Sequence, residues 1–190
     1  MTDHSRQDVR DFYDRIGWSL QDDGLYQNAR YEDLRPVAAE YIHRCHLRLK
    51  SYLAPSGDYL LDAGSGPVQY PEYLTYSQDY RYRVCADLSI TALKEARKRL
   101  GDKGLFVVCD ITRLPFKSDA FDGIVSLHAI HHVDVDKQPA TYAELYRTLK
   151  PGRSAAIVNA WKKPALMEKL GFLIRLSDYL KSAPGALKRR

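Results

Sequence analysis

The feature that most constrains the fold of this chain is a short apolar run that ends in an acidic residue and two closely spaced glycines. Residues 59–67 read Tyr-Leu-Leu-Asp-Ala-Gly-Ser-Gly-Pro. Such a run predicts a buried parallel strand followed by a tight turn. Gly64 and Gly66 allow backbone conformations closed to other residues and let a ligand approach the main chain. Exposed N–H groups in the turn favour an anionic group, and the charge of Asp62 beside it favours a carboxylate over a phosphate.

Further apolar runs follow at regular intervals and alternate with helical patterns. Strands are expected at residues 59–62, 82–87, 105–109, 121–127 and 154–160. Helices are expected at residues 34–53, 68–77, 90–100 and 137–149. Ser89 is a candidate N-cap of the third helix, and Gly101 is expected to end it. The alternation predicts right-handed βαβ crossovers and therefore a doubly wound, mostly parallel α/β sheet with helices on both faces.

Polar side chains stand where these strands end. Asp62, Asp87, Asp110 and His128 all lie at or just beyond the end of an expected strand. Ligands of doubly wound sheets bind at the carboxyl ends of the strands, near the point where the strand order reverses. A carboxylate at Asp87 can accept both ribose hydroxyls of an adenine nucleoside. Asp110 would then lie near the adenine amino group, with Ile111 against the ring.

Four sequence motifs resemble those of a known family, and they follow one another along the chain in the same order as in that family. The D-x-G-x-G turn at residues 62–66 resembles motif I of the class I S-adenosylmethionine (SAM) dependent methyltransferases. The segment L-P-F-x-x-x-x-F-D at residues 114–122 is similar to the one that precedes the fourth strand in small-molecule members. The segment R-T-L-K-P-G-R at residues 147–153 is similar to their turn before the fifth strand, and Asp87 ends the second strand. The resemblance covers roughly residues 9–160.

The resemblance implies a Rossmann-like core with SAM as cofactor. It divides the chain into an N-terminal helical lid (residues 1–57), a SAM-binding core (residues 58–161) and a basic amphipathic helix with a tail (residues 162–190). The positions that match the cofactor-binding residues of the family are Asp62, Gly64, Ser65, Gly66, Asp87, Leu88, Asp110, Ile111 and Leu127.

The chain departs from the family pattern at three places. Val68 stands where motif I usually has a third glycine, and we expect it to begin the following helix. Arg153 replaces a glycine of the turn before the fifth strand. After Trp161 the sequence contains no pattern for the two strands that normally form a C-terminal antiparallel hairpin. The hairpin is therefore expected to be missing, either because the chain is a short form or fragment or because its sheet closes differently.

The resemblance implies transfer of a methyl group to an O, N or C nucleophile of a small molecule. A base is needed only when the acceptor carries a proton. His128 and His131 are the catalytic candidates, since the loop after the fourth strand is expected to face the methyl group. The alternative for both His131 and His132 is a packing or hydrogen-bonding role near a helix start. No metal site is expected, because the neighbouring Asp134 and Asp136 have no distant ligand cluster to complete it.

The aromatic N-terminal segment resembles the family's lid over the cofactor. Tyrosine and tryptophan rings can line an acceptor pocket and attract the sulfonium cation. An arginine there could pair with the methionyl carboxylate. The candidate lid residues are Tyr13, Trp18, Tyr26, Arg30 and Tyr31.

Composition fits a globular protein in a reducing compartment. The apolar fraction is 45% and the charged fraction 28%, with no signal-peptide core and no long apolar run. The three cysteines lack metal-ligand spacing and are expected to be reduced thiols, as in the cytoplasm. Residues 147–190 contain eleven basic residues and two acidic ones, which leaves residues 1–146 with a net charge of −4. The core is therefore not expected to bind nucleic acid.

Alternatives remain open. A nicotinamide oxidoreductase would need glycine where Gln69 stands, and Asp62 would repel a pyrophosphate. A non-catalytic methyltransferase-like domain that serves as a binding or regulatory partner is compatible with the absent hairpin. The basic helix beyond residue 162 either packs on the sheet or touches an anionic membrane surface. The methyl acceptor and the oligomeric state are not encoded in any visible motif.

Overall fold

The computed structural model describes residues 11, 14, 18 and 36–159. Residue contacts divide the chain into two compact units, Met1–Asn159 and Ala160–Arg190. The second unit lies outside the described residues, and with it the expected basic helix and the region after Trp161 where the family's hairpin is expected to be missing. So do most of the expected lid and four of its named residues, Tyr13, Tyr26, Arg30 and Tyr31.

Five parallel strands form the sheet, in the order β3-β2-β1-β4-β5. Their bounds are β1 Gly57–Ala63, β2 Tyr80–Asp87, β3 Gly104–Val108, β4 Gly123–Leu127 and β5 Ala155–Val158. The central strand β1 pairs with β2 through Leu61 and Val84, and with β4 through Leu61 and Ile124. The expected doubly wound Rossmann-like sheet is confirmed. The strand order reverses between β1 and β4, so a ligand site is expected at their carboxyl ends.

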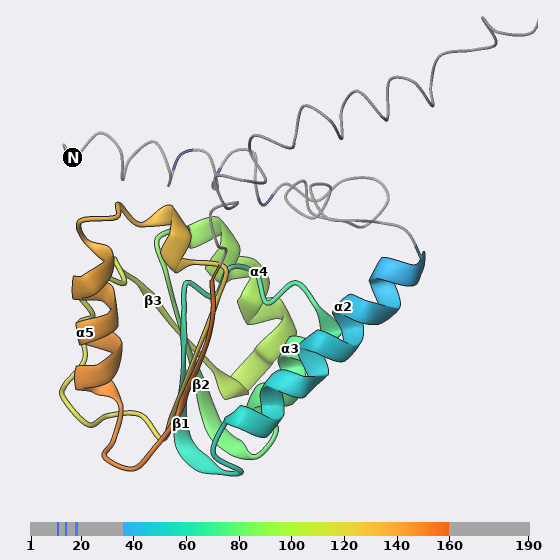
Figure 1. Cartoon of the computed structure of the whole chain (residues 1–190), viewed down its shortest axis with the longest axis horizontal. Coiled ribbons are helices and arrows are strands. Elements are labelled where there is room, and N and C mark those ends of the chain that lie inside the picture. Colours follow the sequence, from blue (N-terminus) through green and yellow to red (C-terminus); the bar gives the residue numbers. More distant parts are fainter. Residues whose placement is uncertain (1–10, 12–13, 15–17, 19–35, 160–190) are drawn as a thin grey trace, which may run out of the picture. The chain divides into compact units, whose positions relative to one another are not determined.

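Helices cover both faces of this sheet (Figure 1). Their bounds are α2 Pro36–Leu49, α3 Pro71–Leu74, α4 Ile90–Leu100 and α5 Gln138–Thr148. Short 3₁₀ turns also occur, η3 Lys50–Tyr52, η4 Thr75–Ser77, η5 Gly101–Lys103 and η6 Ile130–His132. Helix α5 lies on one face, whereas α2, α3 and α4 lie on the other. Because both faces are covered, neighbouring residues of β1 such as Leu60 and Leu61 are both fully buried, in opposite core clusters.

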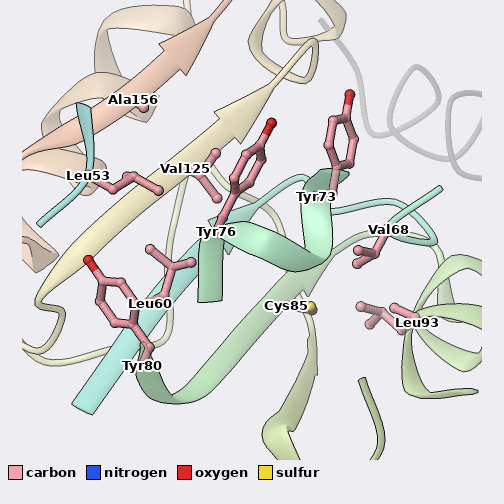
Figure 2. Close-up of a cluster of buried hydrophobic side chains, with 11 residues drawn as sticks. Leu53, Leu60, Val68, Tyr73, Tyr76, Tyr80, Cys85, Leu93, Val125 and Ala156 are labelled. Carbon is pink, nitrogen blue, oxygen red and sulfur yellow. The ribbon is translucent and has the colours of Figure 1, made fainter. Parts of the chain in front are cut away.

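The core cluster beneath α3 and α4 is rich in tyrosine. Figure 2 shows Tyr80 beside Leu60 of the central strand and Leu93 of α4 beside Val68, and Tyr73 and Tyr76 belong to the same cluster. Tyr80 keeps its hydroxyl satisfied by donating to the carbonyl of Ala54, at 2.9 Å. The rings therefore fill the space between sheet and helices without leaving that polar group unpaired.

The structure bears on two further expectations from composition. Among the described residues no helix is both long enough and apolar enough to cross a bilayer. The three cysteines are free thiols, and Cys85 is fully buried in β2. Burial raises the pKa of the Cys85 thiol to about 12, which makes it an unreactive packing group.

Local capping of α4 agrees with the sequence. The Ser89 side chain accepts the N–H of Ala92 at 3.1 Å and caps the helix. Gly101 ends the helix with a φ of 53°, in the left-handed region that favours glycine. Both predictions for this helix are confirmed.

The predicted helix over residues 68–77 is wrong at its start. Helix α3 begins at Pro71, and a 3₁₀ turn follows it. Tyr70 is extended, with φ −97° and ψ 141°, because a residue before proline is disfavoured in the helical conformation. Val68 therefore lies in the turn, not in the helix, with a φ of 53° and a fully buried side chain. A glycine, which the family usually has here, would adopt this conformation without strain.

The two motifs around β4 and β5 contact each other directly. Arg147 of α5 donates to the carbonyls of Phe116 and Leu114 at 2.8 and 3.2 Å. Glu144, which is paired with Arg147, accepts the N–H of Leu114 at 2.8 Å. These hydrogen bonds attach the loop before β4 to the helix before β5. The L-P-F segment and the arginine of the R-T-L-K-P-G segment are thus two halves of one structural unit.

Asp122 joins the amino ends of β1 and β4. Its Oδ2 accepts the N–H groups of Asp58 and Tyr59 at 3.0 and 3.2 Å, and its Oδ1 accepts Nζ of Lys150 at 2.7 Å. The residue is only 4% exposed. Burial alone would raise the pKa of Asp122, but the hydrogen bonds from Lys150 and from the two amides lower it below its usual value. The charged form is therefore the one that stabilises the fold.

The turn after β1 touches the segment that follows β4. Gly64 has a φ of 72°, and a Cβ built on it would lie 2.3 Å from Cβ of Ala129. Ser126 of β4 also donates to the carbonyl of Ala63 at 2.8 Å. A side chain at position 64 would push these segments apart. The first glycine of the motif is thus required both by its backbone conformation and by this close approach.

We predict that Asp122→Asn lowers the free energy of unfolding by about 1.5–3 kcal/mol at pH 7, the usual worth of hydrogen bonds to a charged group. Because the pKa of Asp122 is lowered in the fold, this contribution is present above the unfolded pKa and is lost as the pH falls below about 4. Urea denaturation of both proteins at several pH values measures the difference in their free energies of unfolding. The exposed Asp119→Asn is the control. A difference that stays constant down to pH 3 would contradict the conclusion that the charged form of Asp122 stabilises the fold.

We also predict that Gly64→Ala destabilises the protein more than Gly101→Ala does. Both glycines have a positive φ, which costs an alanine about 1–2 kcal/mol, but a Cβ at Gly101 meets no atom within 4 Å. The excess at Gly64 comes from the clash with Ala129, so adding Ala129→Gly should recover it. Denaturation curves of the single and double variants form the test. Equal losses at the two glycines would show that the contact does not matter.

Candidate functional site

Asp87 connects the glycine turn to the next helix. It ends β2, beside β1, and its Oδ2 accepts the N–H of Gly66 at 2.8 Å. Its Oδ1 accepts the N–H of Ser89, at the start of α4, also at 2.8 Å. Each carboxylate oxygen retains a lone pair for a further donor such as a ribose hydroxyl. The predicted arrangement of turn and carboxylate at one edge of the sheet is therefore present.

The environment of Asp87 disfavours its charge. Burial raises the pKa of this carboxyl to about 6, against the opposing effect of the two amide donors. The neighbouring carboxylates of Asp62 and Asp14 raise it further. A ligand that donates hydrogen bonds to Asp87 would favour its ionised form, so binding and proton release are coupled at this site.

Asp62 has a different environment from the one its position in the motif suggested. It is 3% exposed, and its Oδ2 accepts Nε of Arg83 at 3.0 Å and also Nη2 of the same guanidinium. Because Arg83 compensates its charge, Asp62 would not repel a pyrophosphate as the sequence suggested. Arg83 itself was not predicted from the sequence. The signal for it was an arginine inside an otherwise apolar strand, which needs a buried partner.

The other predicted cofactor residues surround the turn and the ends of β2, β3 and β4. Ser65 is nearly buried and donates to the carbonyl of Gly66 at 3.2 Å. Asp110 follows β3, and its Oδ1 accepts the N–H of Thr112 at 2.8 Å. Ile111 is 8% exposed and belongs to the core cluster beneath α5. Leu88 is half-buried, and Leu127 packs on the opposite cluster.

Two described residues of the N-terminal segment lie at this site. A Cβ built on Gly66 would lie 3.1 Å from Cζ2 of Trp18, so the indole covers the second glycine of the turn. Asp14 accepts the hydroxyl of Ser89 and the N–H of Thr91, at the N-terminus of α4. Trp18 was predicted as a lid residue, whereas Asp14 was not singled out. Both positions agree with a segment that covers the turn.

The candidate catalytic histidines follow β4. His128 has a φ of 53°, and its N–H donates to the carbonyl of Val158 in β5 at 2.8 Å. The rings of His128 and His131 are 6.4 Å apart, and those of His131 and His132 are 3.9 Å apart. Partial burial, followed by the proximity of His128, lowers the pKa of His131. His131 is therefore neutral at pH 7 and able to accept a proton.

A second group of imidazoles, which sequence analysis did not single out, lies on α2. His46 packs its ring on Tyr70 and Tyr73, and its Nδ1 is buried 3.9 Å from Oε2 of Glu72. His43 of the same helix hydrogen-bonds the other oxygen of Glu72. Burial lowers the pKa of His46, Glu72 opposes this, and the proximity of His128 lowers it further. The available signal was the H-x-x-H spacing, which places both rings on one helix face.

The described part of the chain contains no group of three or more histidine, cysteine or acidic side chains arranged to hold a metal ion. The polar atoms near the turn are instead carboxylates, amides and imidazoles.

A family model described as a methyltransferase domain matches residues 61–157. The chain is 30% identical over 99 residues to the ubiquinone/menaquinone biosynthesis C-methyltransferase UbiE of Desulfotalea psychrophila, covering 52% of this chain and 39% of that protein. It is 29% identical over 140 residues to sterol methyltransferase-like 1 of Botryococcus braunii, covering 68% and 35% respectively. The chain thus covers well under two thirds of the length of these relatives.

A solved structure resembles the fold over most of the chain. It is the geranyl diphosphate C-methyltransferase of Streptomyces coelicolor, with a TM-score of 0.64 and 16% sequence identity. The match covers 93% of this chain and 72% of that one. The likeness concerns the fold, whereas the family model reaches from within β1 to within β5 and includes the glycine turn and Asp87. The chain belongs to the class I methyltransferase family, whose cofactor is S-adenosylmethionine.

Proposed function

We propose that this protein binds SAM at the carboxyl ends of β1 and β2 and transfers its methyl group to a small molecule. The observation that carries the proposal is the Asp87 carboxylate, held at 2.8 Å from the amide of Gly66 and retaining lone pairs for hydroxyl donors. The acceptor atom is an O, N or C nucleophile. The names of the relatives, among them C-methyltransferases, favour carbon.

The residues present fit this cofactor. Asp87 would accept the ribose hydroxyls, and the glycine turn would let the methionyl part of the cofactor approach the main chain. The expectation of exposed N–H groups at the two glycines is wrong, because Gly64 donates to the carbonyl of Ala86 at 2.7 Å and Gly66 donates to Asp87. Asp110 and Ile111 would lie on the adenine side. Trp18, whose indole covers Gly66, supports a role of the N-terminal segment as a lid. Asp62 would act through Arg83, because its carboxylate is buried and paired.

When bound, SAM supplies a methyl group already activated by its sulfonium. The residues of the chain therefore contribute mainly alignment, which in well-oriented systems is worth up to about 7–11 kcal/mol. Where the acceptor carries a proton, His128 or His131 would receive it. The lowered pKa of His131 keeps that ring neutral and ready to accept a proton at pH 7.

We predict that titration calorimetry detects binding of SAM and of its demethylated product to the chain. Asp87→Ala should weaken both affinities at least about tenfold, since the lost hydrogen bonds involve a charged acceptor. Asp102→Ala, an exposed carboxylate after α4, is the matched control and should bind as the wild type does. Circular dichroism establishes that each variant is folded. A folded wild-type protein that binds neither compound would refute the proposed function.

We also predict that the affinity for SAM falls as the pH is lowered through about 6. Below that pH, Asp87 is protonated in the free protein, and hydroxyl donors require the ionised form, so binding must release a proton. Calorimetry between pH 5 and pH 8 measures this slope. Asp87→Asn, which cannot ionise, should bind SAM more weakly, and its affinity should depend less on pH. If wild type and Asp87→Asn showed the same slope, another group would be responsible.

A further inference from the structure

A buried arginine lies directly behind the cofactor turn. Arg83 is in the middle of β2, and its residue surface is only 1% exposed. Its Nε and Nη2 donate to Oδ2 of Asp62, and its Nη1 donates to the carbonyl of Tyr73. The guanidinium also lies 6.0 Å from the ring centre of Tyr76. One side chain therefore contacts a strand and a helix that are separate in the sequence.

These two contacts lie on either side of the glycine turn. Asp62 is in β1, just before Gly64, and Tyr73 is in α3, the helix that follows the turn. The segment between them contains Gly64, Gly66 and the left-handed Val68. A single guanidinium thus bridges the residue that enters the turn and the helix that leaves it.

Other side chains hold the turn from outside. Arg99 of α4 donates to the carbonyls of Val68 and Gln69 at 3.1 and 2.8 Å, and Asp87 accepts the N–H of Gly66. Arg99 is exposed, and Asp87 is at the ligand side of the turn. Arg83 supports the turn from the core side, where water cannot replace its hydrogen bonds.

Stability alone does not account for this arrangement. Removing two charges from water is costly, and an apolar pair of similar volume is often equally stable or more so. What the guanidinium adds is geometry, because its rigid fork donates to a carboxylate and to a carbonyl in different directions. A lysine would keep the positive charge but could not donate to both acceptors in the same fixed geometry.

We propose that Arg83 is a positioning residue for the cofactor: it connects both sides of the glycine turn, so that the turn and the Asp87 carboxylate bonded to it keep their binding geometry. The inference rests on the proposed SAM binding. It assigns Asp62 the role of partner to Arg83, and it predicts a loss of affinity from a residue that does not touch the ligand.

The test compares Arg83→Lys with wild type in two measurements. Calorimetry gives the affinity for SAM, which should fall at least tenfold. Hydrogen–deuterium exchange of the protein without ligand should become faster in peptides covering residues 63–74 and stay unchanged in peptides covering β4. Arg81→Lys, an exposed arginine of the same strand, is the matched control and should change neither measurement. Wild-type affinity with wild-type exchange in Arg83→Lys would overturn the inference.

A second variant separates positioning from stability. Asp62→Leu with Arg83→Met replaces the ion pair by apolar side chains and is expected to unfold at a urea concentration close to that of wild type. It should still bind SAM at least tenfold more weakly, with faster exchange at residues 63–74. A stable double variant with wild-type affinity, or loss of the fold in both variants, would overturn the inference. If wild type itself failed to bind SAM, the proposed function would be refuted. The exchange data would still show whether the hydrogen bonds of Arg83 to Asp62 and Tyr73 hold the turn in place.

Discussion

The parallel pairing of β1 with β2 on one side and with β4 on the other is the constraint on which the rest of the structure depends. It places the carboxyl ends of three strands side by side, and the strand order reverses there. The turn after β1 then contacts Asp87 at the end of β2 and Ala129 after β4. Among the described residues, the groups assigned to the cofactor or to proton transfer lie near the carboxyl ends of β1 to β4 or on the N-terminal segment.

The edge is held by hydrogen bonds between side chains and backbone. Asp87 connects the amide of Gly66 to β2, and Arg83 connects β2 to Asp62 before the turn and to the carbonyl of Tyr73 after it. At the opposite, amino ends of the strands, Asp122 connects β1 to the loop before β4. Charged side chains suit this task because one group can satisfy several backbone partners in different directions. The motifs of the family are therefore structural in part: the carboxylate of F-D and the arginine before L-K-P-G organise the sheet rather than contact a ligand.

Most of the fold could be predicted from the sequence. The strands, the N-cap Ser89 and the glycine end of α4 are encoded locally, in apolar runs and in residues with special backbone preferences. The helix starts at Pro71 and not at residue 68, because the proline disfavours a helical conformation of Tyr70. The partner of Asp62 could not be found, since Arg83 is distant in the sequence and reaches it only when β1 and β2 pair.

The sequence by itself determined the sheet, the family and the residues that meet at the cofactor edge, because these follow from local patterns repeated in a fixed order. The tertiary structure alone decided which carboxylate faces a ligand and which is buried. Asp62 and Asp87 look alike in the sequence, yet one pairs with a guanidinium inside the core and the other retains lone pairs at the edge. The physical reason is that burial and partnership arise from segments brought together by folding, and they set the charge, the pKa and the role of each group.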